Sequence, residues 1–137
     1  MAATTAHRVL SVDRAIRAVL IADVVESVRL IEEDEEGVIS RWLALVSHIQ
    51  TNLLPTCKGK LVKQLGDGML LEFGTIQDAL FAAFAIQRAS DSRNQDVAPD
   101  RRIALRIGIE VDEVIIDKDD VYGRGVNLAS RLATLAG

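Results

Sequence analysis

Two aspartates stand where a folded chain commonly holds a ligand. Asp67 lies in the segment Gly66-Asp67-Gly68 between two apolar runs, a pattern that strongly indicates a β-hairpin. Asp23 lies near the end of the apolar segment 17–25, which predicts a buried strand. Carboxylates that meet at the end of a sheet suit Mg²⁺ or Mn²⁺, because these ions take one or two carboxylates together with substrate phosphates. Each aspartate alone is more typical of a simple turn or strand end, so a metal site requires a fold that brings them together.

Other chemistries lack their motifs. The acidic run 32–36 has neither the ligand spacing nor the central glycine of a calcium loop and is more typical of a solvated helix start. The segment Gly123-Arg124-Gly125 is followed by Leu128 where a dinucleotide-binding loop requires its third glycine. Cys57, the single cysteine, excludes an internal disulfide and the usual multi-cysteine zinc site. We interpret it as a small buried residue.

Length and composition predict one ordinary globular domain. The chain has 137 residues and a net charge of −4, which argues against a general nucleic-acid binder because such proteins normally carry a basic surplus. Its uncharged stretches fall short of the roughly 20 apolar residues of a membrane span. With no secretory signal pattern and one cysteine, the sequence predicts a cytoplasmic protein.

The predicted elements that must position the aspartates are strands and helices in the order β-α-α-β-β-α-β-β-α. In chain order they are a buried strand over 17–25, a short helix over 27–33, a longer helix ended by Pro55, the hairpin, a helix capped by Thr75 and running to about Arg93, a strand over 102–111, a turn at Asp112-Glu113 into a strand over 114–116, a polar loop over 117–120 and a last helix over 123–135. This order predicts an α+β fold: a ferredoxin-like split βαβ sheet with helices packed on one face. In such a sheet the first strand flanks the hairpin, so Asp23 is expected to lie near Asp67.

Three segments resemble the class III adenylate/guanylate cyclase catalytic domain in order and spacing. They are 21–25, 63–68 and 120–132, of which the last is the most specific. The resemblance runs from about residue 17 to the end, so we expect residues 1–16 to be an N-terminal lead-in and 17–137 a C-terminally shortened cyclase domain. It implies a dimer with active sites at the interface. It further implies an adenylate cyclase, a lyase of cyclic nucleotide biosynthesis and intracellular signal transduction that converts ATP to 3′,5′-cyclic AMP and pyrophosphate.

The resemblance implies a role for each matching residue. Asp23 and Asp67, with the carbonyl of Val24, would bind two Mg²⁺ or Mn²⁺ ions, of which one activates the ribose 3′-hydroxyl and the other neutralises the leaving pyrophosphate. Lys63 and Asp120 would read the adenine base. Either residue alone is also consistent with a strand lysine reaching water or an aspartate making a turn.

Two further residues lie on the predicted last helix. Asn127 and Arg131 are four residues apart, hence on one helix face. The resemblance makes Asn127 an orienter of the ribose and Arg131 the cation that stabilises charge on the α-phosphate. Arginine suits this role because its planar group stays charged and binds phosphate oxygens in pairs. Without the resemblance, the pair is consistent with a polar helix face.

The sequence departs from the family pattern at two places. Glu26-Ser27-Val28 stands where family members usually have glycine, an aromatic residue and then serine or threonine. The chain also ends at Gly137, before further strands that the family domain normally has. The alternative reading is therefore a catalytically degenerate cyclase-like module for dimerisation or nucleotide binding. We expect a homodimer if the domain is active, with a possible regulatory domain in a longer parent.

Overall fold

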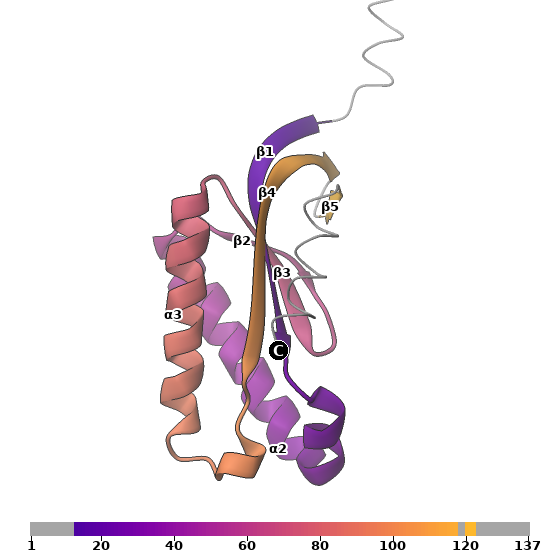
Figure 1. The fold of residues 1–137 in the computed structure, drawn as a ribbon, viewed down its shortest axis with the longest axis vertical. Helices are drawn as coiled ribbons and strands as arrows, with labels where there is room; N and C mark the ends of the chain where they lie inside the picture. The colour runs from indigo at the N-terminus through magenta and orange to yellow at the C-terminus, as the bar shows by residue number, and fades with distance from the viewer. Residues whose placement is uncertain (1–12, 118–119, 123–137) are drawn as a thin grey trace, which may run out of the picture.

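The computed structural model describes residues 13–117 and 120–122, with side chains over 16–111. Five strands form one antiparallel sheet in the order β2-β3-β1-β4-β5, and helices α2 and α3 cover one face of it (Figure 1). The bounds are β1 Asp13–Val24, α2 Ser27–His48, β2 Lys60–Gln64, β3 Gly68–Phe73, α3 Ile76–Asn94, β4 Leu105–Asp117 and β5 Asp120–Tyr122. The predicted α+β sheet is confirmed.

Strand β1 occupies the centre of the sheet. Val19 and Leu20 point to opposite faces of the strand, and both are completely buried, which agrees with the continuous apolar run from which a buried strand was predicted. The strand begins at Asp13, four residues before the predicted start at Arg17. The additional residues pair with the far end of β4, where Asp13 lies opposite Ile116.

Strand β4 is longer than the sequence indicated. It runs through Asp112 and Glu113 without a break, so the turn predicted at these two residues is wrong. Polar residues are tolerated here because the extended β1 supplies a partner, with Glu113 opposite Ile16. The chain instead reverses after Asp117, which pairs with Asp120 of β5.

Helix α2 consists of two helical pieces joined at Asp34. This residue has non-helical dihedral angles, φ −157° and ψ 69°, and its Oδ1 accepts a 3.3 Å hydrogen bond from the Gly37 N–H. Asp34 thereby caps the second piece, since an aspartate oxygen can satisfy a free N–H in the first turn. The predicted division into a short and a longer helix is confirmed. A π-helical turn over Ile49–Leu53 and a 3₁₀ turn over Leu54–Thr56, which contains Pro55, follow.

Helix α3 packs against the sheet and fixes the start of β4. The predicted Thr75 cap is present, with Thr75 Oγ1 accepting from the Asp78 N–H at 3.1 Å. Near the other end of the helix, the Asn94 amide bonds both the N–H and the carbonyl of Ile103, at 3.1 and 2.8 Å. Ser90 Oγ donates to the same carbonyl at 3.0 Å. These bonds hold β4 where it enters the sheet.

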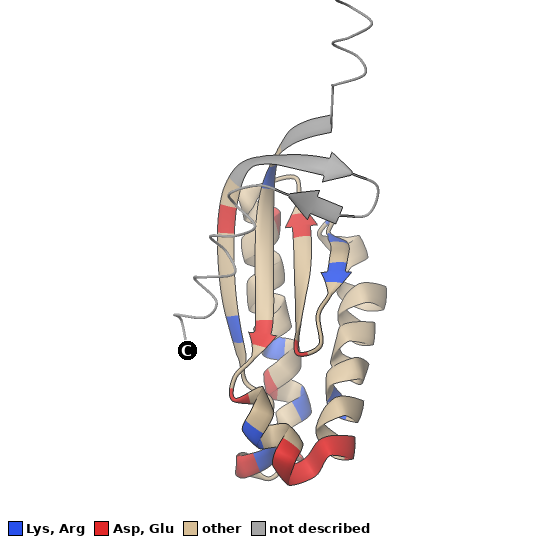
Figure 2. Ribbon diagram, turned by 90° about the vertical axis from the view of Figure 1, so that its right-hand side faces the viewer, with Lys and Arg blue, Asp and Glu red and all other residues tan. Residues whose placement is uncertain are grey.

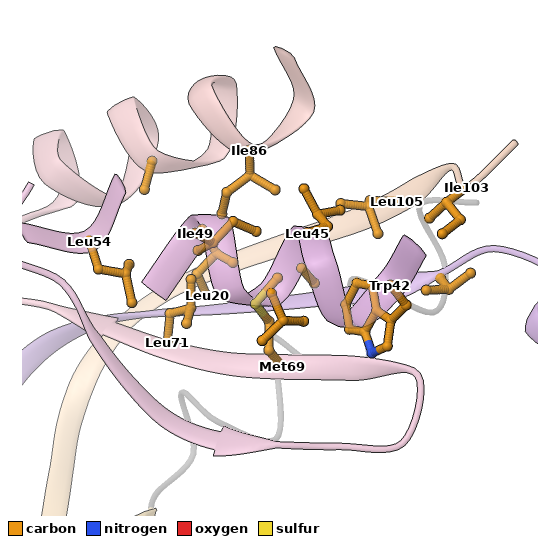
Figure 3. Close-up of a cluster of buried hydrophobic side chains, with 14 of the residues drawn as sticks. Leu20, Trp42, Leu45, Ile49, Leu54, Met69, Leu71, Ile86, Ile103 and Leu105 are labelled. Atoms are coloured by element: carbon orange, nitrogen blue, oxygen red, sulfur yellow. The ribbon is translucent and has the colours of Figure 1, made fainter. Parts of the chain in front are cut away.

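The core lies between the sheet and the two helices (Figure 3). It is built from large apolar side chains of every layer, including Leu20, Trp42, Leu45, Ile49, Met69, Leu71 and Ile86. Each such side chain stabilises the fold by about 1.5–3 kcal/mol on burial. Cys57 is also buried, as predicted. Within the described residues, no helix combines the length and apolarity of a membrane span.

Candidate metal centre

The fold brings Asp23 and Asp67 to the same end of the sheet. Asp23 lies opposite Gly68 in the β1–β3 register, and the Val24 N–H donates to the Asp67 carbonyl oxygen at 2.8 Å. Figure 2 shows the acidic end of β1 beside the acidic tip of the β2–β3 hairpin. The residues predicted from the sequence to converge are therefore neighbours, and Val24 lies next to both.

A glycine makes this close approach possible. A Cβ at Gly68 would lie 2.8 Å from the Ala22 carbonyl oxygen and 3.2 Å from the Asp23 Cβ, closer than a backbone oxygen accommodates. The Leu65 N–H donates to the Gly68 carbonyl at 2.8 Å, which closes the turn. The hairpin tip thus approaches β1 because Gly68 has no side chain.

The Asp23 carboxylate is half-buried and carries an orphaned oxygen. Asp23 Oδ1 is buried and accepts no hydrogen bond, although Arg106 Nε lies 3.6 Å from it. Burial raises the pKa of Asp23, the Arg106 charge lowers it, and the Asp67 charge raises it. A cation placed between the two carboxylates would offset both the cost of burying the charged Asp23 and its repulsion from Asp67.

This donor set fits Mg²⁺ or Mn²⁺. The orphaned Asp23 oxygen and the neighbouring Asp67 supply two hard carboxylate ligands. Among the described residues, no cluster of three or more His, Cys, Asp or Glu side chains could hold a metal ion. The remaining ligands would have to be a backbone carbonyl, water or substrate oxygens, which is the usual arrangement for magnesium bound with a phosphate substrate.

Arg106 is not among the site residues predicted from the sequence. It lies directly opposite Asp23 in the β1–β4 register and places a guanidinium at the edge of the carboxylate pair. The available signal was a basic residue in the alternating strand predicted over 102–111. Its position opposite Asp23 depends on the antiparallel register, which the sequence alone does not specify.

Two side-chain interactions are made at the start of α2, next to the end of β1. Ser27 Oγ donates to Asp67 Oδ2 at 2.7 Å. Glu26 has a left-handed backbone conformation, φ 54°, and its carboxylate pairs with Arg29 at 3.2 Å. The negative charge that Glu26 adds near the site is therefore partly offset by Arg29, which also bonds Glu33 and the Asp100 carbonyl.

The predicted base-reading residues lie on strands that approach each other. Lys63 is exposed on β2, just after a register shift between Leu61 and Lys63. Asp120 begins β5. Although β2 and β5 are the two ends of the strand order, Cα atoms of these strands come within 8 Å. The Asp120 side chain, and Asn127 and Arg131 with the predicted last helix, fall outside the described residues.

Comparison with known proteins finds similarity to nucleotide cyclases. Residues 14–137 match the family model described as the adenylate and guanylate cyclase catalytic domain. The chain is 36% identical over 126 residues to candidate adenylate cyclase 3 of Rhizobium meliloti (strain 1021), covering 92% of this chain and 22% of that protein. It is 39% identical over 132 residues to an adenylate cyclase of Streptomyces griseus, covering 91% of this chain and 30% of that protein.

One solved structure is also close. An adenylate/guanylate cyclase/hydrolase from Silicibacter pomeroyi superposes with a TM-score of 0.80 at 34% identity, covering 91% of this chain and 72% of that chain. The chain therefore spans less than a third of the two curated relatives but most of a solved cyclase chain.

Proposed function

Because the chain belongs to the adenylate and guanylate cyclase catalytic domain family, we propose that it converts ATP to 3′,5′-cyclic AMP and pyrophosphate. The observation that carries the proposal is that Asp23 and Asp67 meet at the end of the sheet. One Asp23 oxygen is buried there without a hydrogen bond, 3.6 Å from Arg106 Nε. Relatives named as adenylate cyclases support ATP as the substrate.

The paired carboxylates would hold Mg²⁺ or Mn²⁺ together with the Val24 carbonyl. When bound, such ions lower the pKa of the ribose 3′-hydroxyl and offset charge on the leaving pyrophosphate. The protein's part is to fix the ligands: Gly68 permits the approach of the hairpin, and the Val24–Asp67 backbone bond holds the two strands together. Arg106, beside Asp23, would contribute a positive charge next to the phosphates.

Lys63 and Asp120 would select the base. Adenine presents an acceptor at N1 and a donor at N6, which a lysine and an aspartate complement respectively. Guanine reverses both groups and would leave each protein partner unpaired, at a cost of about 1–3 kcal/mol apiece. The approach of β5 to β2 supports the pair, because it allows one chain to supply both residues.

Asn127 and Arg131 would complete the site. Asn127 would orient the ribose, and Arg131 would stabilise the charge that develops on the α-phosphate. We propose that the site forms between two copies of the chain, with the carboxylates from one copy and the base-reading pair from the other. Within a longer parent protein, a regulatory domain would control this dimer.

A second candidate function is nucleotide binding without turnover. It is favoured by Glu26, which introduces a carboxylate and a strained backbone where the triphosphate is expected to lie. The Arg29 pair weakens this objection, because it offsets the Glu26 charge. The two candidates differ in one observable: only the first forms cyclic AMP.

The test is product formation. The whole chain is incubated with Mn²⁺ and either ATP or GTP, and cyclic nucleotide and pyrophosphate are separated by chromatography, beside an Asp67→Ala variant. We expect cyclic AMP from ATP, little product from GTP, and at least a hundredfold less product from the variant. Equal product from wild type and Asp67→Ala contradicts the enzyme assignment. ATP binding without product supports the second candidate.

A further inference from the structure

Asp67 receives a side-chain hydrogen bond from the first residue of α2. Ser27 Oγ and Asp67 Oδ2 are 2.7 Å apart and 40 residues apart in sequence. Asp67 is exposed at the hairpin tip, where a carboxylate would otherwise be free to rotate between staggered conformers. The bond engages one carboxylate oxygen and leaves Oδ1 available on the same group.

The left-handed turn before α2 directs the serine hydroxyl to this place. Glu26, at φ 54°, reverses the chain between β1 and α2, and the Val24 N–H bond to the Asp67 carbonyl holds the hairpin tip beside the start of the helix. The end of β1, the tip of the β2–β3 hairpin and the start of α2 therefore meet at Asp67.

We propose that Ser27 is a positioning residue that holds Asp67 in the orientation needed to bind the metal ion. The inference rests on the proposed function, because it assumes that Asp67 is a metal ligand. A carboxylate fixed by an outer hydrogen bond loses less freedom when a cation binds, and it presents its remaining oxygen in a defined direction. Removing the hydroxyl should weaken metal binding while leaving the fold intact.

The test is a titration of the whole chain with Mn²⁺ alone, monitored by calorimetry and by the electron paramagnetic resonance signal of free Mn²⁺. Ser27→Ala is expected to raise the dissociation constant about tenfold, in the range found for lost outer-shell partners. Ser27→Thr keeps a hydroxyl and is expected to bind close to wild type. Ser40→Ala, an exposed serine on the same helix, should have no effect. Thermal unfolding of each variant in EDTA checks that the fold is unchanged.

The possible outcomes are distinct. Binding by Ser27→Ala as tight as wild type, or tighter, overturns the positioning role, and so does an equal loss in Ser27→Ala and Ser27→Thr. An Asp67→Ala variant that binds like wild type, or a wild type that binds no Mn²⁺, overturns the metal assignment itself and the positioning role with it. Loss in Ser27→Ala with rescue in Ser27→Thr supports both.

Discussion

At the scale of single residues, Glu26 combines an unusual backbone conformation with a charge. Its φ of 54° lies in the left-handed region, which costs a residue with a Cβ about 1–2 kcal/mol. Its carboxylate pairs with Arg29 at 3.2 Å, an exposed interaction that contributes little. Glycine would adopt this backbone conformation without that cost, so Glu26 is held here at a cost in stability.

Replacing Glu26 with glycine should stabilise the protein. Glycine adopts this conformation without a Cβ clash, and after its greater loss of backbone entropy we expect a gain of about 0.5–1 kcal/mol in the free energy of unfolding. Urea denaturation measures this gain. Glu32→Gly, inside the regular helix, is the control and should lose about 1 kcal/mol. A Glu26→Gly variant that is destabilised as much as the control would refute the explanation.

A site residue could be predicted from the sequence only where the pattern that marks it lies in the residues next to it. Asp67 stands between two glycines and Asp23 near the end of an apolar run, so each could be placed at an element end. Arg106 and Ser27 could not be assigned, because their importance comes from contacts across 83 and 40 residues of sequence, to Asp23 and Asp67. The roles of Lys63, Asp120, Asn127 and Arg131 stay predictions.

At the scale of elements, the division of α2 at Asp34 could be predicted from the acidic run that interrupts its apolar pattern. The lengths of β1 and β4 were not. Polar residues such as Asp112 and Glu113 normally indicate a turn, yet here each has a partner on the extended β1. A strand's end depends on whether its neighbour continues, and the sequence of one strand does not contain that information.

The cap at Asp34 should contribute measurably to the free energy of unfolding. Asp34 Oδ1 accepts from the Gly37 N–H, and Oδ2 lies 3.6 Å from Arg41. Asp34→Ala removes both and should lower the free energy of unfolding by about 1 kcal/mol, measured by urea denaturation. Asp34→Asn keeps the cap and should lose less than half as much. Equal losses in the two variants, or no loss in Asp34→Ala, would contradict the capping role.

At the scale of the whole molecule, the hairpin carries residues with two different proposed tasks. Asp67 at the tip lies beside Asp23, whereas Lys63 is on the strand that β5 approaches. If the carboxylates serve the site of one copy and Lys63 the site formed with the other copy, each hairpin contributes to two active sites. A single chain would then have no complete site, and activity would depend on protein concentration.

Mixing two inactive variants tests this account most directly. Asp67→Ala disables the metal ligands and Lys63→Ala disables base reading, so each homodimer should form little cyclic AMP from ATP and Mn²⁺. In a mixed dimer one site carries both changes and the other carries neither. With random pairing, about half of the dimers are mixed and each holds one intact site of two, so the mixture should regain about a quarter of wild-type activity. A mixture no more active than the better of the two variants alone would contradict the account.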